Sequence, residues 1–165
     1  MSDLQAQIDI LAQQEDLLRF PYFTHRSAWD FGIFMVERAR ELNTTIAVSI
    51  RTPNGSILFQ HLPDGTNHLN ELWMRRKFNT VTTFESSSLR ATYECRLKDE
   101  GLAQHGLKDE DYALCGGGFP IRTVGSSALV GVLLASNLPH IEDHEFLTSS
   151  LREYLHITAP QFHEE

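Results

Sequence analysis

Two histidines in the stretch SNLPHIEDHEF lie four residues apart, a spacing that can place both rings on one face of a helix, as in metal sites. They are His140 and His144, and Ile141 stands where the HExxH motif of metalloproteases requires glutamate. Pro139 places His140 at or before the first helical turn, and His144 borders the apolar face that includes Leu147. We expect His144 to be a partly buried side chain that orders the turn from strand to helix. A pocket-facing polar group and a metal ligand are the alternatives.

The second group of candidate residues is a basic cluster in an otherwise acidic chain. Arg75–Lys77 follow Trp73, and three consecutive helical positions cannot all face the same way. One interpretation is a solvated face whose long side chains cover apolar surface. The other is a site for a small anion, in which Arg76 or Lys77 acts with the hydroxyls around Ser87 at the start of the next helix.

The third candidate is the glycine run in CGGGFPIRTVGSS. Phosphate-binding glycine loops open a helix whose N-terminus faces the anion, whereas Gly116–Gly118 precede Pro120 and the strand-like IRTV. We therefore expect a bend between two antiparallel strands, where glycine permits close approach of other groups, and the bend could also line a ligand pocket. Cys115 is the better placed of the two cysteines for reactivity, because Cys95 falls on a helix that we expect to pack in the core.

Composition limits the classes of function. The chain has 165 residues, 41% of them hydrophobic, and a formal net charge of −8, which argues against binding to a nucleic-acid backbone. No apolar run is long enough for a membrane span, and the acidic, glutamine-rich N-terminus does not read as a secretory signal. Two isolated cysteines without CxxC spacing then indicate reduced thiols, so we expect a cytoplasmic protein.

The elements that must position these residues follow from hydrophobic periodicity and turn signals. Helical spacing predicts helices over residues 3–18, 28–42, 67–82, 87–99 and 141–157, with Ser27 and either Ser86 or Ser87 as helix N-caps. Residues 46–51 and 57–59 form a hairpin around Pro53–Gly55, and three further strands are expected in YALC, FPIRTV and SALVGVLLAS. The predicted order α-α-β-β-α-α-β-β-β-α indicates an α+β fold, with a five-stranded antiparallel sheet and flanking helices.

Three motifs carry a resemblance to a known family. GGGFPI, GVLLASNLPHIEDHEF and the upstream WMRRK…TV..F..SS resemble the HbpS-like, haem-degrading family, related to GlcG and to the C-terminal domain of PduO-type proteins. The motifs are most similar to the uncharacterised GGGFP/LPxxxDH branch, over about residues 31–155, although SNLP replaces the Ser-Gly ending usual after the last strand. The matched positions are Trp73, Arg76, Lys77, Ser87, Gly116, Gly117, Gly118, Pro120, Asp143 and His144.

The resemblance implies a profilin-like or PAS-like sheet, homo-oligomers from dimers upward, and haem as a possible cofactor, although no matched motif assigns an axial haem ligand. It also implies a single domain over residues 1–165, with residues 1–25 as an N-terminal helical extension.

Three functional interpretations follow. The first is a small-ligand or tetrapyrrole-binding domain, with a pocket between the glycine bend, Trp73 and His144, no metal ligand, and a small anion as a possible ligand. The expected ligand-binding residues are Trp73, Arg76, Lys77, Ser87, Gly117, Gly118 and His144. The second is a non-catalytic oligomeric or adaptor protein without a cofactor. The third, less favoured, is an enzyme that uses His144 or Cys115. None of the three involves nucleic acid or a membrane.

Overall fold

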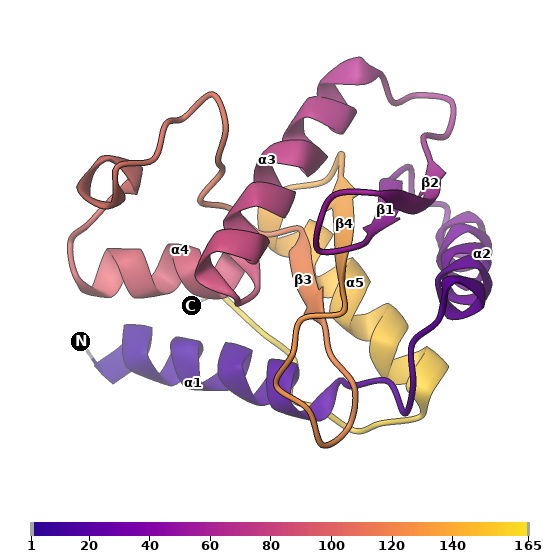
Figure 1. Ribbon diagram of the computed structural model, residues 1–165, viewed down its shortest axis with the longest axis horizontal. Helices are drawn as coiled ribbons and strands as arrows, with labels where there is room; N and C mark the ends of the chain where they lie inside the picture. Colours follow the sequence, from indigo (N-terminus) through magenta and orange to yellow (C-terminus); the bar gives the residue numbers. More distant parts are fainter. Residues whose placement is uncertain (1, 165) are drawn as a thin grey trace.

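The computed structural model describes residues 2–164 and contains five α-helices and four strands (Figure 1). The helices are α1 (Ser2–Leu17), α2 (His25–Glu41), α3 (His68–Phe84), α4 (Ser88–Leu97) and α5 (His140–Leu155), and a short 3₁₀ helix covers Leu102–His105. The strands are β1 (Ala47–Arg51), β2 (Ile57–His61), β3 (Gly118–Ile121) and β4 (Gly131–Ser136). Within the described residues, no helix is both long and apolar enough to cross a bilayer.

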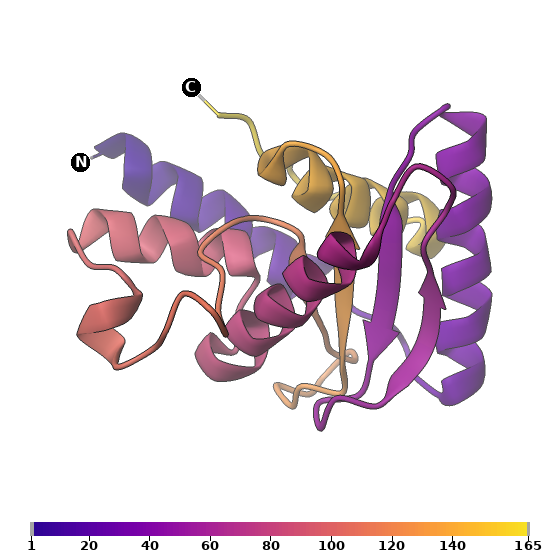
Figure 2. The same ribbon diagram turned by 90° about the horizontal axis from the view of Figure 1, so that it is seen from above.

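The strands form one antiparallel sheet in the order β2-β1-β4-β3, with helices on both faces (Figure 2). Helices α2 and α5 pack on one face and α3 packs on the other. Strand β1 shows why the sheet has two apolar faces. Val48 and Ile50 belong to the core under α2 and α5, while Ala47 belongs to the core under α3. This alternation is the one that the sequence predicted for β1.

The prediction of five strands was wrong, because residues 112–115 (YALC) form no strand. Side chains of α3 bind this segment's backbone instead. Thr80 Oγ1 donates to the carbonyl of Ala113 at 2.8 Å and accepts from its N–H at 3.1 Å, and Arg76 Nε donates to the carbonyl of Tyr112 at 3.1 Å. A segment whose backbone groups are bound by a helix does not need a neighbouring strand.

The helix starts confirm one predicted cap and correct the other. The Ser87 hydroxyl accepts from Arg90 N–H at 3.1 Å and caps α4 as expected. Ser27 is not an N-cap, because α2 begins earlier and Thr24 caps it. Ser27 is the reciprocal partner in that capping box, in which Thr24 Oγ1 accepts from Ser27 N–H and Ser27 Oγ accepts from Thr24 N–H.

Helices α1 and α4 lie side by side at one end of the molecule, next to the C-terminal segment (Figure 1). Their contact forms a small core separate from the two cores on the sheet, made by Ile8, Leu11, Leu89, Tyr93 and Phe162. This third core packs against α5 through Ile141, and its Phe162 ring lies 6.3 Å from the ring of His144.

Candidate functional site

A cavity of about 350 Å³ opens between α3, the start of α5 and the turn after β4. Its wall combines apolar side chains with amide, hydroxyl, thiol, imidazole, ammonium and carboxylate groups, a mixture typical of small-molecule sites. The lining residues are Leu69, Asn70, Trp73, Lys77, Cys115, Ser136, Asn137, Leu138, His140 and Asp143.

A buried ion pair forms the inner wall of this cavity. Lys77 Nζ lies 3.0 Å from Asp143 Oδ2, and the two side chains are only 3% and 2% exposed. Lys77 also donates to the carbonyl of Ala135 at 2.8 Å, and Asp143 Oδ1 accepts from Leu138 N–H at 3.0 Å. Burial raises the pKa of Asp143, while the Lys77 ammonium acts in the opposite direction. The pair therefore ties α3 to β4 and to the start of α5.

The glycine run lets strand β3 begin directly against this ion pair. Gly117 has φ +119°, and a Cβ there would lie 2.6 Å from both the Ala135 carbonyl oxygen and Lys77 Nζ. A Cβ at Gly116 would overlap the carbonyl oxygen of His140. The glycines allow close packing of the backbone at the cavity wall, and the segment continues into β3 rather than into a helix. The predicted bend between two antiparallel strands was wrong, because residues 112–115, directly before the glycines, form no strand.

His140 and Cys115 present their polar atoms near the cavity in defined protonation states. The backbone N–H of Gly116 donates to His140 Nδ1 at 3.0 Å, so the neutral ring carries its proton on Nε2. Burial lowers the pKa of His140, which keeps the ring neutral at physiological pH. Burial raises the pKa of the Cys115 thiol, which keeps it protonated and poorly nucleophilic.

His144 does not line the cavity, although the sequence analysis placed it at the pocket. It is completely buried, more than the partial burial that we expected, and its Nε2 lies 2.8 Å from Oε1 of Gln14 on α1. Gln14 donates its amide to the carbonyl of Pro160, so His144 Nε2 is the donor to Gln14 and Nδ1 remains without a partner. Burial lowers the pKa of His144 to about 3. This histidine ties α5 to α1 and, through α1, to the C-terminal segment.

The seven residues expected to bind a ligand are therefore divided among several places. Trp73 and Lys77 line the cavity, and Gly117 lies directly behind Lys77. Arg76 stacks over the Trp73 ring, with its guanidinium carbon 4.1 Å from the ring centroid. Ser87 is buried as the cap of α4. The remaining two residues, Gly118 and His144, pack against other parts of the core.

Sequence reasoning missed several cavity residues, among them Asn70, Ser136 at the end of β4, and Asn137 in the turn that follows. A signal for Asn70 was present, because Asn70, Trp73 and Lys77 follow the 3-then-4 spacing of one helix face. No comparable signal marks the turn, whose position depends on the pairing of β4 with β1. Asn70 donates to Ser136 Oγ at 3.2 Å and thereby links α3 to the end of β4.

Comparison with known proteins places the chain in a family. The sequence profile described as "Haem degrading protein HbpS-like" matches residues 23–152, so the chain belongs to the HbpS-like family. It is 32% identical to a UPF0303 protein of Yersinia enterocolitica, over 95% of this chain and 93% of that protein. Helix α1 lies outside the residues that the family profile matches.

Two solved structures share the fold. The crystal structure of the Ybr137w protein superposes with a TM-score of 0.82 and 27% identity, over 90% of this chain and 87% of that one. The structure described as a PduOC:heme complex superposes with a TM-score of 0.59 and 18% identity, over 84% of this chain and 99% of that one. The second similarity establishes the fold alone.

The cavity residues, as arranged here, do not fit a haem iron. An axial ligand must offer a free lone pair, most often from histidine or a cysteine thiolate. His140 already uses its Nδ1 lone pair for Gly116 N–H and carries a proton on Nε2, and Cys115 remains a thiol. His144 lies outside the cavity, fully buried. The groups that do face the cavity are hydrogen-bond donors and acceptors.

Proposed function

We propose that this protein binds a small polar molecule, with an anionic or carbonyl oxygen, in the cavity between α3 and α5. The observation that carries the proposal is the buried Lys77 ammonium in the cavity wall, where it has three N–H donors and uses two on Ala135 and Asp143. The third donor, together with the Nε2–H of His140, is available to a ligand oxygen. Because Asp143 already balances the charge of Lys77, we expect an oxygen-rich ligand of low charge.

The apolar part of the cavity supports a ligand that also has a carbon skeleton. Leu69, Trp73 and Leu138 line the cavity, and the Arg76 guanidinium stacks on the Trp73 ring. Apolar walls with a few fixed polar groups are the usual arrangement in sites for small organic molecules. The proposal keeps Trp73 and Lys77 from the predicted set and adds Asn70 and His140.

Fluorescence titration tests this proposal, because the chain has two tryptophans and only one of them, Trp73, lines the cavity. In a Trp29→Phe variant, Trp73 is the single reporter, and a short monocarboxylate such as lactate and a neutral amide such as acetamide serve as probes. We expect a saturable change in emission that weakens at least tenfold in Kd when His140→Phe is added. If neither probe gives a saturable change, binding of a small oxygen-rich ligand at this cavity is disproved.

Hemin is the competing probe, because the family description and one structural neighbour refer to haem. In one outcome, the Soret band shifts, saturates near one hemin per subunit, and does not shift in His140→Ala. This would show that His140 binds the iron in place of its hydrogen bond from Gly116 N–H. We expect no such dependence on His140, since its Nδ1 is already bound. A saturable Soret shift that persists in His140→Ala would place haem elsewhere on the chain.

Catalysis has the weakest support of the three functional interpretations. Cys115 is held as a thiol by burial, and His144 has no solvent access. Oligomer formation, the second interpretation, stays a prediction from the family resemblance.

A further inference from the structure

The contact between α1 and the start of α4 places a carboxylate where an anion would bind. Glu15 of α1 is 4% exposed and lies against the hydroxyl and the backbone N–H of Ser87, the N-cap of α4. Its Oε1 atom lies 3.5 Å from Nη1 of Arg90 and 3.7 Å from Nη1 of Arg122. A helix N-terminus carries partial positive charge, and guanidinium groups bind carboxylate and phosphate oxygens, so these groups together form a site for an oxyanion.

The Glu15 carboxyl fills this site but does not satisfy it. Both of its oxygens are buried, and neither accepts a hydrogen bond of ordinary geometry. The two guanidinium contacts are longer than the roughly 2.7–2.9 Å of a charge-assisted hydrogen bond. Burial also raises the pKa of Glu15 to about 7, so protonated and ionised forms coexist near neutral pH. An unsatisfied buried carboxyl beside two cations marks a position that a better-placed anion would occupy.

The two arginines differ in how much of their charge is left for such an anion. The Arg122 side chain is 13% exposed and donates to two backbone carbonyls, at 2.7 and 3.1 Å, which fix its guanidinium in place. Within the described residues, Glu15 is its one ion-pair partner. Arg90 pairs in addition with Glu94 at 2.9 Å. Arg122 is therefore the cation with the greater need of an anion, and Arg90 is the one whose removal disturbs the fold less.

Helix α1, which carries Glu15, is attached mainly to α4 and to the C-terminal segment (Figure 1). Its Ile8 and Leu11 belong to the third core, and among the described residues of α1 none belongs to the two cores on the sheet. The residues that the family profile matches begin after α1. Movement of α1 away from α4 would therefore leave both cores of the sheet intact.

We propose that the start of α4, together with Arg90 and Arg122, is a binding site for a small oxyanion, and that Glu15 occupies this site as an internal substitute. A carboxylate or phosphate ion competes with Glu15 and displaces α1 when it binds. The sequence analysis placed an anion at Ser87 with cations from the preceding helix. The structure instead supplies the cations from α4 and from the segment after β3. This site is independent of the cavity between α3 and α5.

Glu15→Ala tests the site directly, because it removes a fragment the size of acetate and leaves both arginines in place. Calorimetric titration with acetate and with inorganic phosphate at neutral pH should show saturable binding of one ion per chain. We expect the Kd to be at least tenfold lower than for the wild type, in which the ion must first displace Glu15. Circular dichroism verifies that the variant is folded.

A second substitution in this variant locates the bound ion. Addition of Arg90→Gln should raise the Kd at least tenfold. Arg26→Gln is the matched control and should leave the Kd unchanged, because Arg26 pairs with Asp30 on its own helix as Arg90 pairs with Glu94. An ion that binds in the cavity instead would be lost in His140→Phe and retained in Arg90→Gln, which would overturn the proposal. Absence of saturable binding to Glu15→Ala would overturn it as well.

The wild type provides a test that needs no folded variant. Phosphate, compared with sodium chloride at the same ionic strength, should speed hydrogen exchange of the α1 amides at least fivefold and leave the amides of β4 unchanged. Arg90→Gln should abolish this difference, and Arg26→Gln should preserve it. Exchange in α1 that does not respond to phosphate, or that responds equally in Arg90→Gln, would show that no anion competes with Glu15.

Discussion

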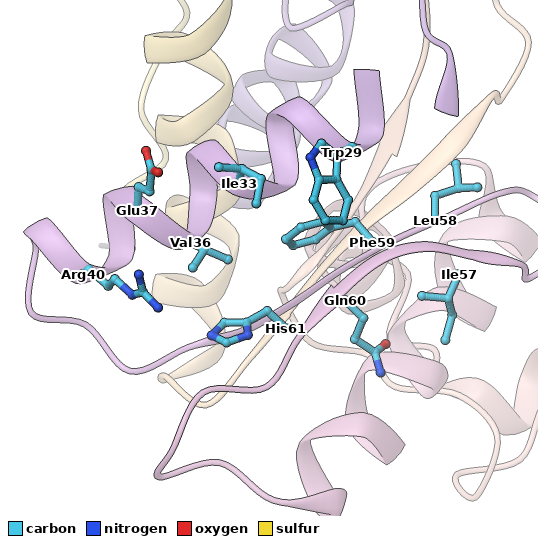
Figure 3. Close-up of a pocket in the computed structure, with 10 residues that line it drawn as sticks. All are labelled: Trp29, Ile33, Val36, Glu37, Arg40, Ile57, Leu58, Phe59, Gln60 and His61. Carbon is cyan, nitrogen blue, oxygen red and sulfur yellow. The ribbon is translucent and has the colours of Figure 1, made fainter. Parts of the chain in front are cut away.

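The cavity between α3 and α5 has a volume of about 350 Å³, and the groove between α2 and β2 has a volume of about 460 Å³ (Figure 3). They differ in whether their charged side chains are paired. In the cavity, Lys77 and Asp143 neutralise each other inside the chain, at 3% and 2% exposure. In the groove, Glu37 and Arg40 have no partner within residues 2–164, and the apolar side chains around them are exposed. The charges of the cavity are therefore balanced within the fold, whereas those of the groove remain exposed to solvent.

The same difference predicts which substitutions change the stability of the fold and which change association. When one member of a buried ion pair is removed, the other charge stays buried without compensation, and this lowers the free energy of unfolding. An exposed side chain without a partner contributes little to folding. Substitutions at the cavity should therefore change stability, and substitutions in the groove should change only association.

The largest effect is expected at the buried ion pair. Lys77→Met leaves the Asp143 carboxylate buried without its cation, which should lower the free energy of unfolding by about 3–5 kcal/mol. Urea denaturation measures this loss. In the double variant Lys77→Met/Asp143→Leu both charges are absent, and we expect it to recover much of the stability. A single variant that loses less than about 1 kcal/mol would show that the pair is not stabilised by burial as argued.

The next effect is a pH dependence at the contact between α1 and α4. Glu15 is 4% exposed, with Arg90 at 3.5 Å and Arg122 at 3.7 Å, and burial raises its pKa from 4.5 to about 7. The folded state thus binds this proton more tightly than the unfolded state. Its stabilising contribution is complete below pH 4.5 and is lost as the pH rises through about 7, a change of about 3 kcal/mol.

Glu15→Gln removes this titration and provides the measurement. The stability of Glu15→Gln relative to wild type should rise by about 3 kcal/mol between pH 4.5 and pH 8. His144 acts in the opposite direction, because its pKa falls from 6.5 to about 3 on folding, so its contribution is lost as pH falls through that range. Since both proteins contain His144, the difference between them isolates Glu15. A difference that does not vary with pH would mean that Glu15 stays ionised beside its two arginines.

A smaller loss is expected where the glycine run meets the cavity wall. Gly117→Ala places a Cβ against the Ala135 carbonyl at positive φ and should cost about 2 kcal/mol. Gly125→Ala is the control, because Gly125 also has positive φ (+80°) but has nothing within 4 Å of the added Cβ, so it should cost about 1 kcal/mol. Thermal and urea unfolding of both variants separate crowding from backbone strain. Equal losses would mean that crowding at Gly117 is relieved by relaxation.

Local patterns in the sequence explain which parts of this fold could be predicted. The hairpin turn at Pro53–Gly55 and the Ser87 cap depend on residues close in the chain, and both predictions agree with the structure. The fifth strand was predicted from the composition of YALC, but side chains of α3, more than thirty residues earlier, bind that backbone. Hydrophobic periodicity cannot reveal such long-range hydrogen bonds.

The candidate site shows the same limit. Trp73 and Lys77 lie at the cavity, as the motif suggested, although their role in binding stays a prediction. The spacing of His144 from Leu147 shows which face of the helix it lies on. It does not show whether a pocket or another helix lies against that face. Its actual partner, Gln14, is 130 residues away on α1, and only tertiary packing brings the two together.

The smallest effect on folding should come from the groove, and it provides the sharpest contrast with the cavity. Ile57→Lys adds a charge to the open edge strand, which should abolish the self-association that the family resemblance implies, while it changes the free energy of unfolding by no more than about 0.5 kcal/mol, measured at concentrations where copies are separate. Leu69→Lys is the matched control, because Leu69 is similarly apolar and 59% exposed but lines the cavity. It should leave association intact. If both lysine variants lower association equally, the effect is one of general charge, and the groove has no specific part in association.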